Sequence, residues 1–145
     1  MASTYQIKVR NYEEGKVVSL TPDSTTVLVR GDLVTWESNT VKLADAAADD
    51  ATWIGICLGA SATGVTEKID VCYGWVKGTA TMVSGTYRFG DNIKYDDSAD
   101  DGSMTAGGGA NDYGFIIDDS AVTTRTSAEV VLDPYNLSKF FDINA

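Results

Sequence analysis

Histidine is absent from this chain of 145 residues, and cysteine and proline occur only twice each. Without histidine the chain cannot form a Ser-His-Asp triad, a Cys-His pair, a zincin motif or a histidine-based zinc site. Two cysteines are too few for a disulfide framework or a metal knuckle. We therefore interpret Cys57 and Cys72 as small core residues in a reducing cytoplasm, although a hairpin could also bring them face to face.

Positive charge is also scarce, since 11 basic residues stand against 21 acidic ones and the formal net charge is −10. A chain this acidic is a poor partner for nucleic acid and for an anionic membrane, because both carry its own sign. No apolar run approaches the roughly 20 residues that span a bilayer. The N-terminus has no basic segment followed by an apolar one, so we expect no signal peptide and a protein made in the cytoplasm.

The residues that are present favour strands and turns. Hydrophobic residues make up 43% of the chain, which excludes general disorder, and there are 14 glycines. Tyr5, Ile7 and Val9 alternate with polar residues, as in a half-buried strand. The acidic, Gly-rich stretch 96–111 is expected to be a solvated loop or a hairpin tip. Strands are expected at residues 4–12, 17–20, 33–36, 41–43, 53–58, 69–76, 79–83, 93–95, 113–117 and 128–132.

The chain contains a weak internal repeat, whose two copies align in one constant register without a gap. The aligned pairs are Gly31-Asp32 with Gly90-Asp91, Val34 with Ile93, Gly55 with Gly114, Ile56 with Phe115, and Val71 with Val130. Glycine in the centre of a strand usually marks a bulge or a close backbone approach. The repeat therefore predicts a duplicated strand unit, two copies of which pack their apolar faces together as a small barrel or sandwich.

We therefore predict an all-β fold in three parts. Residues 1–26 form an N-terminal arm or edge strands. Residues 27–132 form the β domain, with repeat units 31–73 and 90–132. Residues 133–145 form a C-terminal tail.

Both ends of the chain carry apolar side chains that have no counterpart in the repeat. Such an end either pairs with another chain, by strand addition or by insertion of its aromatic rings, or closes its own sheet. The sequence leaves both interpretations open. The candidate residues for contact with another chain are Tyr5, Ile7, Val9, Tyr12, Tyr135, Leu137, Phe140, Phe141 and Ile143.

The acidic residues give no motif for catalysis or for metal binding. The run from Asp96 to Asp101 before Gly102 suggests a calcium loop, but Ala99 and Gly108 would stand where oxygen ligands are required. Nothing singles out a pair of carboxylates for glycoside hydrolysis. We therefore predict a non-enzymatic protein that holds no metal and no cofactor.

Several short motifs in a set order resemble a family of tailed-bacteriophage capsid cement, or head decoration, proteins. The family pattern reads Gly-Asp-hydrophobic, Val-Lys, Ala-Asp-Asp-Ala and Ile-Gly-(Ile/Val). This chain carries it as Gly31-Asp32-Leu33-Val34, Val41-Lys42-Leu43, Ala47 to Ala51 and Ile54-Gly55-Ile56-Cys57-Leu58, followed by Val76-Lys77-Gly78, Gly90 to Tyr95, Tyr113 to Ile116 and Glu129 to Leu132. The resemblance covers about residues 27–132.

The resemblance implies a compact β-tulip-like domain on the outer surface of an assembled phage head, made in the host cytoplasm. Such proteins commonly form trimers at local threefold positions and clamp neighbouring major capsid subunits against internal DNA pressure. The implied partners are thus the major capsid protein and two sister subunits, with neither nucleic acid nor membrane. The long N-terminal segment and the tail after Pro134 depart from the plain form of the family, so binding mode and stoichiometry do not carry over through them.

The three tryptophans leave a second function open. Trp36, Trp53 and Trp75 could form a stacking platform for sugars, but their place within strand patterns favours core packing. Exposed aromatic rings would support the alternative function, a carbohydrate-binding β module. Retention on a polysaccharide gel distinguishes such a module from a capsid protein, which instead sediments with phage heads.

Overall fold

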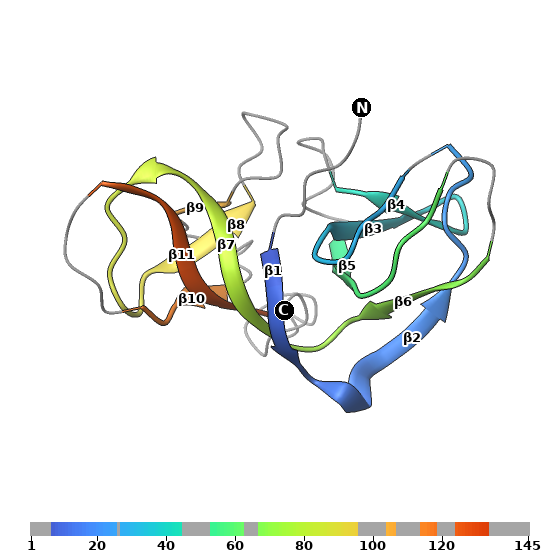
Figure 1. The fold of residues 1–145 in the computed structure, drawn as a ribbon, viewed down its shortest axis with the longest axis horizontal. Helices are drawn as coiled ribbons and strands as arrows, with labels where there is room; N and C mark the ends of the chain where they lie inside the picture. The colour runs from blue at the N-terminus through green and yellow to red at the C-terminus, as the bar shows by residue number, and fades with distance from the viewer. Residues whose placement is uncertain are drawn as a thin grey trace, which may run out of the picture.

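The computed structural model describes residues 7–25, 27–44, 53–62, 67–95, 104–106, 114–118 and 124–133, and it is an all-β protein (Figure 1). This confirms the predicted fold class. The strands are β1 (Ile7–Tyr12), β2 (Val17–Leu20), β3 (Leu33–Glu37), β4 (Thr40–Leu43), β5 (Trp53–Cys57), β6 (Ile69–Cys72), β7 (Val76–Gly85), β8 (Asn92–Tyr95), β9 (Met104–Ala106), β10 (Gly114–Ile116) and β11 (Arg125–Leu132). A single turn of 3-10 helix, η1 (Glu14–Lys16), separates β1 from β2.

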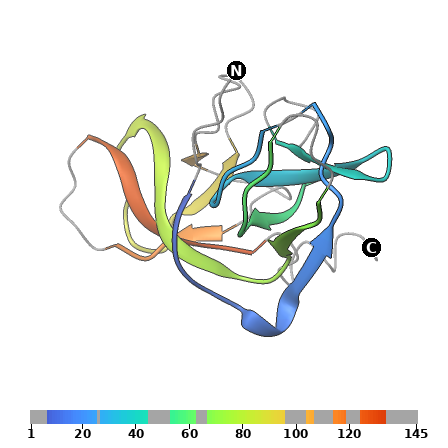
Figure 2. The same ribbon diagram turned by 45° about the vertical axis from the view of Figure 1, so that its right-hand side comes forward.

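The strands form two sheets, and in each sheet a parallel contact joins segments that are distant in the strand order. The first sheet has the order β2-β6-β5-β3-β4, and its ends meet where Val41 bridges Pro22 in parallel. The second has the order β1-β7-β11-β10-β8-β9, and β9 returns to β7 through the parallel pair Met82–Met104, which closes five strands into a barrel. We call β2–β6 the first unit and β7–β11 the second unit. The two units lie side by side, with β1 between them (Figures 1 and 2).

The two units repeat each other strand by strand. Their orders correspond, since β2-β6-β5-β3-β4 in the first unit becomes β7-β11-β10-β8-β9 in the second. The register of the repeat also extends upstream of the aligned motifs, because it matches Val17, where β2 begins, with Val76, where β7 begins. Residues 17–20 of the segment that we predict as an N-terminal arm or edge strands form β2, which lies first in the order of the first sheet and pairs with β6.

The Gly-Asp turn is built in the same way in both units. Gly31 has a left-handed backbone (φ 101°), which glycine adopts without steric cost, and the Val29 N–H donates to Asp32 Oδ2 over 2.9 Å. The Gly31 N–H donates to the Cys57 carbonyl over 2.8 Å, which ties the turn to β5. The same bonds and the same left-handed glycine recur at the equivalent positions of the second unit, which are Arg88, Gly90, Asp91 and Ile116.

A close approach of two backbones explains the glycine in the middle of β5 and the one at the start of β10. A Cβ atom at Gly55 would lie 2.2 Å from the carbonyl oxygen of Cys72, and one at Gly114 would lie 1.9 Å from that of Val131. Cys72 and Val131 are themselves equivalent positions of the repeat. The predicted close approach is thus present in both units.

Apolar residues of the repeat fill the interior of each unit. The pairs that are buried in both copies are Leu28 and Tyr87, Val34 and Ile93, Cys57 and Ile116, Ile69 and Ala128, and Val71 and Val130. β6 contributes to both cores, because Val71 packs inside the first unit while Cys72 joins the core that extends into the second. The following residue, Tyr73, is exposed.

Two expectations from the strand pattern were wrong. Met104 was placed in a solvated stretch, but it is fully buried and begins β9, the strand that closes the second barrel. Trp36 was expected in the core, but 38% of it is exposed. Trp36 shares the inward face of β3 with Val34, yet it lies where the strand reaches the tight turn at Ser38 and Asn39, both with positive φ. Trp75 is half-buried, and the side chain of Trp53 lies outside the described residues.

Candidate interaction face

Four residues in register form a row across the outer face of the first unit. Leu33 lies opposite Ile56, Ile56 opposite Cys72, and Cys72 opposite Val17. Residues directly opposite in antiparallel strands point to the same side of the sheet. Leu33, Ile56 and Cys72 are buried and Val17 packs against them, so this outer row is part of the core that the two units share.

The corresponding row of the second unit is open. Asn92 lies opposite Phe115, Phe115 opposite Val131, and Val131 opposite Lys77. Phe115 is 42% exposed, Asn92 and Lys77 are exposed, and Val131 is half-buried. We call these four residues the open row. The first three are the repeat equivalents of the buried residues in the first row, whereas Lys77 directly follows the equivalent of Val17.

β1 contacts the first unit, and its Ile7 belongs to the same buried cluster as Leu33, Ile56 and Cys72. The Ile7 N–H donates to the Gly31 carbonyl over 3.1 Å, and the Arg30 guanidinium lies over the Tyr12 ring, 5.9 Å from its centroid. Ile7 is fully buried in the shared core. Strand β1 pairs with β7 of the second unit while it contacts the first, so it holds the two units together.

The turn beside the open row adds a second exposed ring. Phe89 is 65% exposed, the highest value among the large apolar residues that the structure describes. Its counterpart in the first unit is Arg30, which is engaged with Tyr12 and donates to the Leu58 carbonyl over 3.2 Å. Isolated exposed apolar residues are common, but two exposed phenylalanines on one barrel are consistent with a contact surface.

Polar contacts fix β1 on the outer side of the second unit. Arg10 pairs with Glu129 over 2.6 Å and donates to the Thr79 hydroxyl over 3.2 Å, and that hydroxyl donates to Glu129 over 2.8 Å. These three residues lie on three adjacent strands, β1, β7 and β11. The cluster therefore anchors β1 to the second unit at the border of the open row.

The candidate contact residues of the N-terminus lie on β1. Ile7 has no exposed surface, so its side chain cannot contact another protein in this structure. Val9 and Tyr12 are half-buried against the shared core. The other candidates lie outside the described residues: Tyr5, Tyr135, Leu137, Phe140, Phe141 and Ile143. Phe89, Phe115 and Lys77 were not among the candidates. The two copies of the repeat have similar sequence patterns, so the sequence does not show which copy has an exposed outer face.

Both cysteines are buried and free, which confirms the prediction that they serve packing. Burial raises the pKa of the Cys57 thiol to about 11 and also raises the pKa of Cys72. The thiolate is the reactive form of cysteine, so neither position has the character of a catalytic or redox-active thiol.

Within the described part of the chain, no group of three or more cysteine, aspartate or glutamate side chains is arranged to hold a metal ion. The same residues include no helix with the length and apolar character that a bilayer crossing requires. Comparison with known proteins finds no matching family model and no similar curated protein.

Proposed function

We propose that the chain is a head decoration protein of a tailed bacteriophage. In this proposal it binds the outer surface of the assembled capsid as a homotrimer and clamps neighbouring major capsid subunits. The motifs that resemble this family are structural here: Gly31-Asp32 and Gly90-Asp91 make the repeated turns, and Gly55 allows β5 to approach β6. These motifs therefore have a role in the fold, as the proposal requires.

The observation that carries the proposal is the open row. A sheet row that is buried in one unit is exposed in the other and has an aromatic ring near its centre. An apolar centre with a polar border is the usual composition of a protein contact surface. Several such contacts in one trimer would add up to tight attachment, because each further contact forms within an already bound complex.

Replacing Phe115 by serine is expected to weaken binding to phage heads by about tenfold or more. Truncating an aromatic anchor at the centre of an interface typically costs about 2 kcal/mol. Binding is measured by co-sedimentation with expanded heads of the parent phage. Tyr73→Ser is the matched control, since Tyr73 is 38% exposed on the first unit. Equal binding of the wild type and both variants would exclude the open row, and failure of the wild type to sediment with heads would exclude the function.

The exposure of Trp36 favours a carbohydrate-binding module as the second candidate function. An exposed indole is the usual platform for a sugar ring. If this function holds, the wild type is retarded on a polysaccharide affinity gel and Trp36→Ala removes the retardation. A wild type that runs unretarded on gels of several polysaccharides would dispose of this candidate.

A further inference from the structure

The open row lies among basic side chains, although the chain as a whole carries a net charge of −10. Lys77 belongs to the row itself. Lys94 is two residues beyond Asn92 in β8, so it lies on the same side of the sheet. Lys8 lies opposite Thr79, whose hydroxyl bonds with Arg10 and Glu129 on the outer side of the sheet. Lys8 therefore points to the same outer side. Four of the 11 basic residues thus lie on the outer side of the six-stranded sheet, on β1, β7 and β8.

Only one of these four cations has a carboxylate partner in the described part of the chain. Arg10 is paired with Glu129 over 2.6 Å, whereas the ion pairs of the described residues include neither Lys8, nor Lys77, nor Lys94. Lys77 lies directly opposite Val131, Lys94 follows Asn92 on the same side of β8, and Lys8 lies one strand further out on β1, so the described part of this outer side combines lysines outside those ion pairs with an apolar centre.

From this arrangement we propose that the open row and its three lysines dock onto an acidic protein surface. The proposal rests on the proposed function, in which that surface belongs to the exterior of the capsid shell. Carboxylates opposite Lys77 and Lys94 would orient the chain, and an apolar patch opposite Phe115 and Val131 would supply affinity. Charges at the border of an interface mainly set orientation and the association rate, and the buried centre supplies most of the binding free energy.

The composition of the face favours a protein over a nucleic acid. Tight attachment to DNA typically uses about six to ten phosphate contacts, roughly twice or more the number of lysines on this face. The rest of the chain repels a polyanion at long range because of its net charge of −10. A protein surface with a few carboxylates around an apolar patch matches both the number of lysines and the central phenylalanine.

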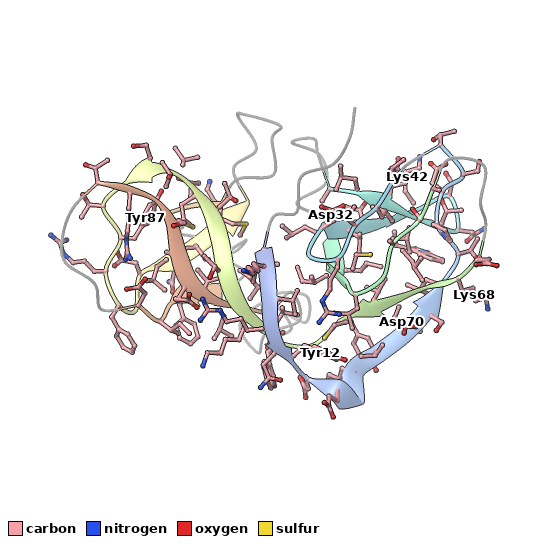
Figure 3. All side chains as sticks on the ribbon, viewed as in Figure 1. Tyr12, Asp32, Lys42, Lys68, Asp70 and Tyr87 are labelled. Atoms are coloured by element: carbon pink, nitrogen blue, oxygen red, sulfur yellow. The ribbon has the colours of Figure 1, made fainter. Side chains whose placement is uncertain are left out.

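The test compares two double charge reversals of the full chain. Lys77→Glu with Lys94→Glu changes the face, while Lys16→Glu with Lys68→Glu makes the same change of charge on the side of the first unit. Lys68 lies at the end of the molecule far from the second unit (Figure 3). Binding to DNA-free expanded heads is measured by co-sedimentation at low and high salt. We expect the first variant to bind at least about tenfold more weakly at low salt, and the control to bind within about threefold of the wild type.

The outcomes separate this inference from the function on which it rests. If the wild type does not sediment with heads, the decoration function fails. If it sediments and the two double variants bind alike, the function stands and the proposed face is wrong. Two further results would overturn the choice of partner: retention of the wild type on phage DNA that is lost in the first variant, or a change in its oligomeric state without a change in head binding.

Discussion

Alanine at Gly55 or at Gly114 is expected to destabilise the protein by about 3 kcal/mol or more, a large part of the stability of a small domain. The added Cβ atom would lie 2.2 Å from the Cys72 carbonyl oxygen in the first case and 1.9 Å from the Val131 carbonyl oxygen in the second. Neither oxygen can move away without breaking the pairing of β5 with β6 or of β10 with β11. The free energy of unfolding is obtained from denaturant titration.

Gly15→Ala is the matched control for these two substitutions. Gly15 lies in the 3-10 turn between β1 and β2, and a Cβ atom there meets nothing within 4 Å. We expect the control to change the free energy of unfolding by less than about 0.5 kcal/mol. If Gly55→Ala and Gly114→Ala were as mild as the control, the close approach of the strands would not be a requirement of the fold.

The second large effect is expected at the Gly-Asp turn, where the repeat supplies its own comparison. Asp32 is fully buried and accepts the Val29 N–H over 2.9 Å, whereas its counterpart Asp91 is half-buried and accepts the Arg88 N–H over 2.8 Å. Removing the acceptor leaves the backbone N–H unpaired, and the cost rises with burial. We therefore expect Asp32→Ala to cost about 3 kcal/mol and Asp91→Ala about 1 kcal/mol.

Denaturant titration of both alanine variants, together with the asparagine variants, checks this order. Asparagine retains an acceptor oxygen, so Asp91→Asn should restore most of the stability that Asp91→Ala loses. A larger loss at Asp91 than at Asp32 would contradict this explanation, because the two turns share their hydrogen bonds and differ in burial.

Most of the fold could be predicted from the repeat and the alternation of apolar residues. Gly31-Asp32 and Gly90-Asp91 do form equivalent turns, and Gly55 and Gly114 do mark equivalent close approaches. These features are local, so they depend on residue type and spacing alone. Strand β9 was missed because Met104 is the one large apolar residue in an acidic, Gly-rich stretch, and one residue gives no period.

The candidate interaction face could not be predicted in the same way. Ile56 and Phe115 are equivalent in the repeat, yet the first is fully buried and the second is 42% exposed. Ile56 belongs to the core that the two units share, together with Ile7 of β1, whereas Phe115 lies outside that core. We also predicted Ile7 as a contact residue. A terminal strand with alternating apolar and polar residues has the same sequence pattern whether its apolar side packs on its own core or on another protein.

In the proposed function, the open row of the second unit holds this protein on the outside of a phage head. A cryo-EM map of parent heads saturated with the protein tests it most directly. We predict density on the outer surface of the shell, with the face formed by β7, β8, β10 and β11 turned toward the capsid and Phe115 in contact with it. A map without such density, or one in which this face points to solvent while the first unit contacts the shell, would contradict the claim.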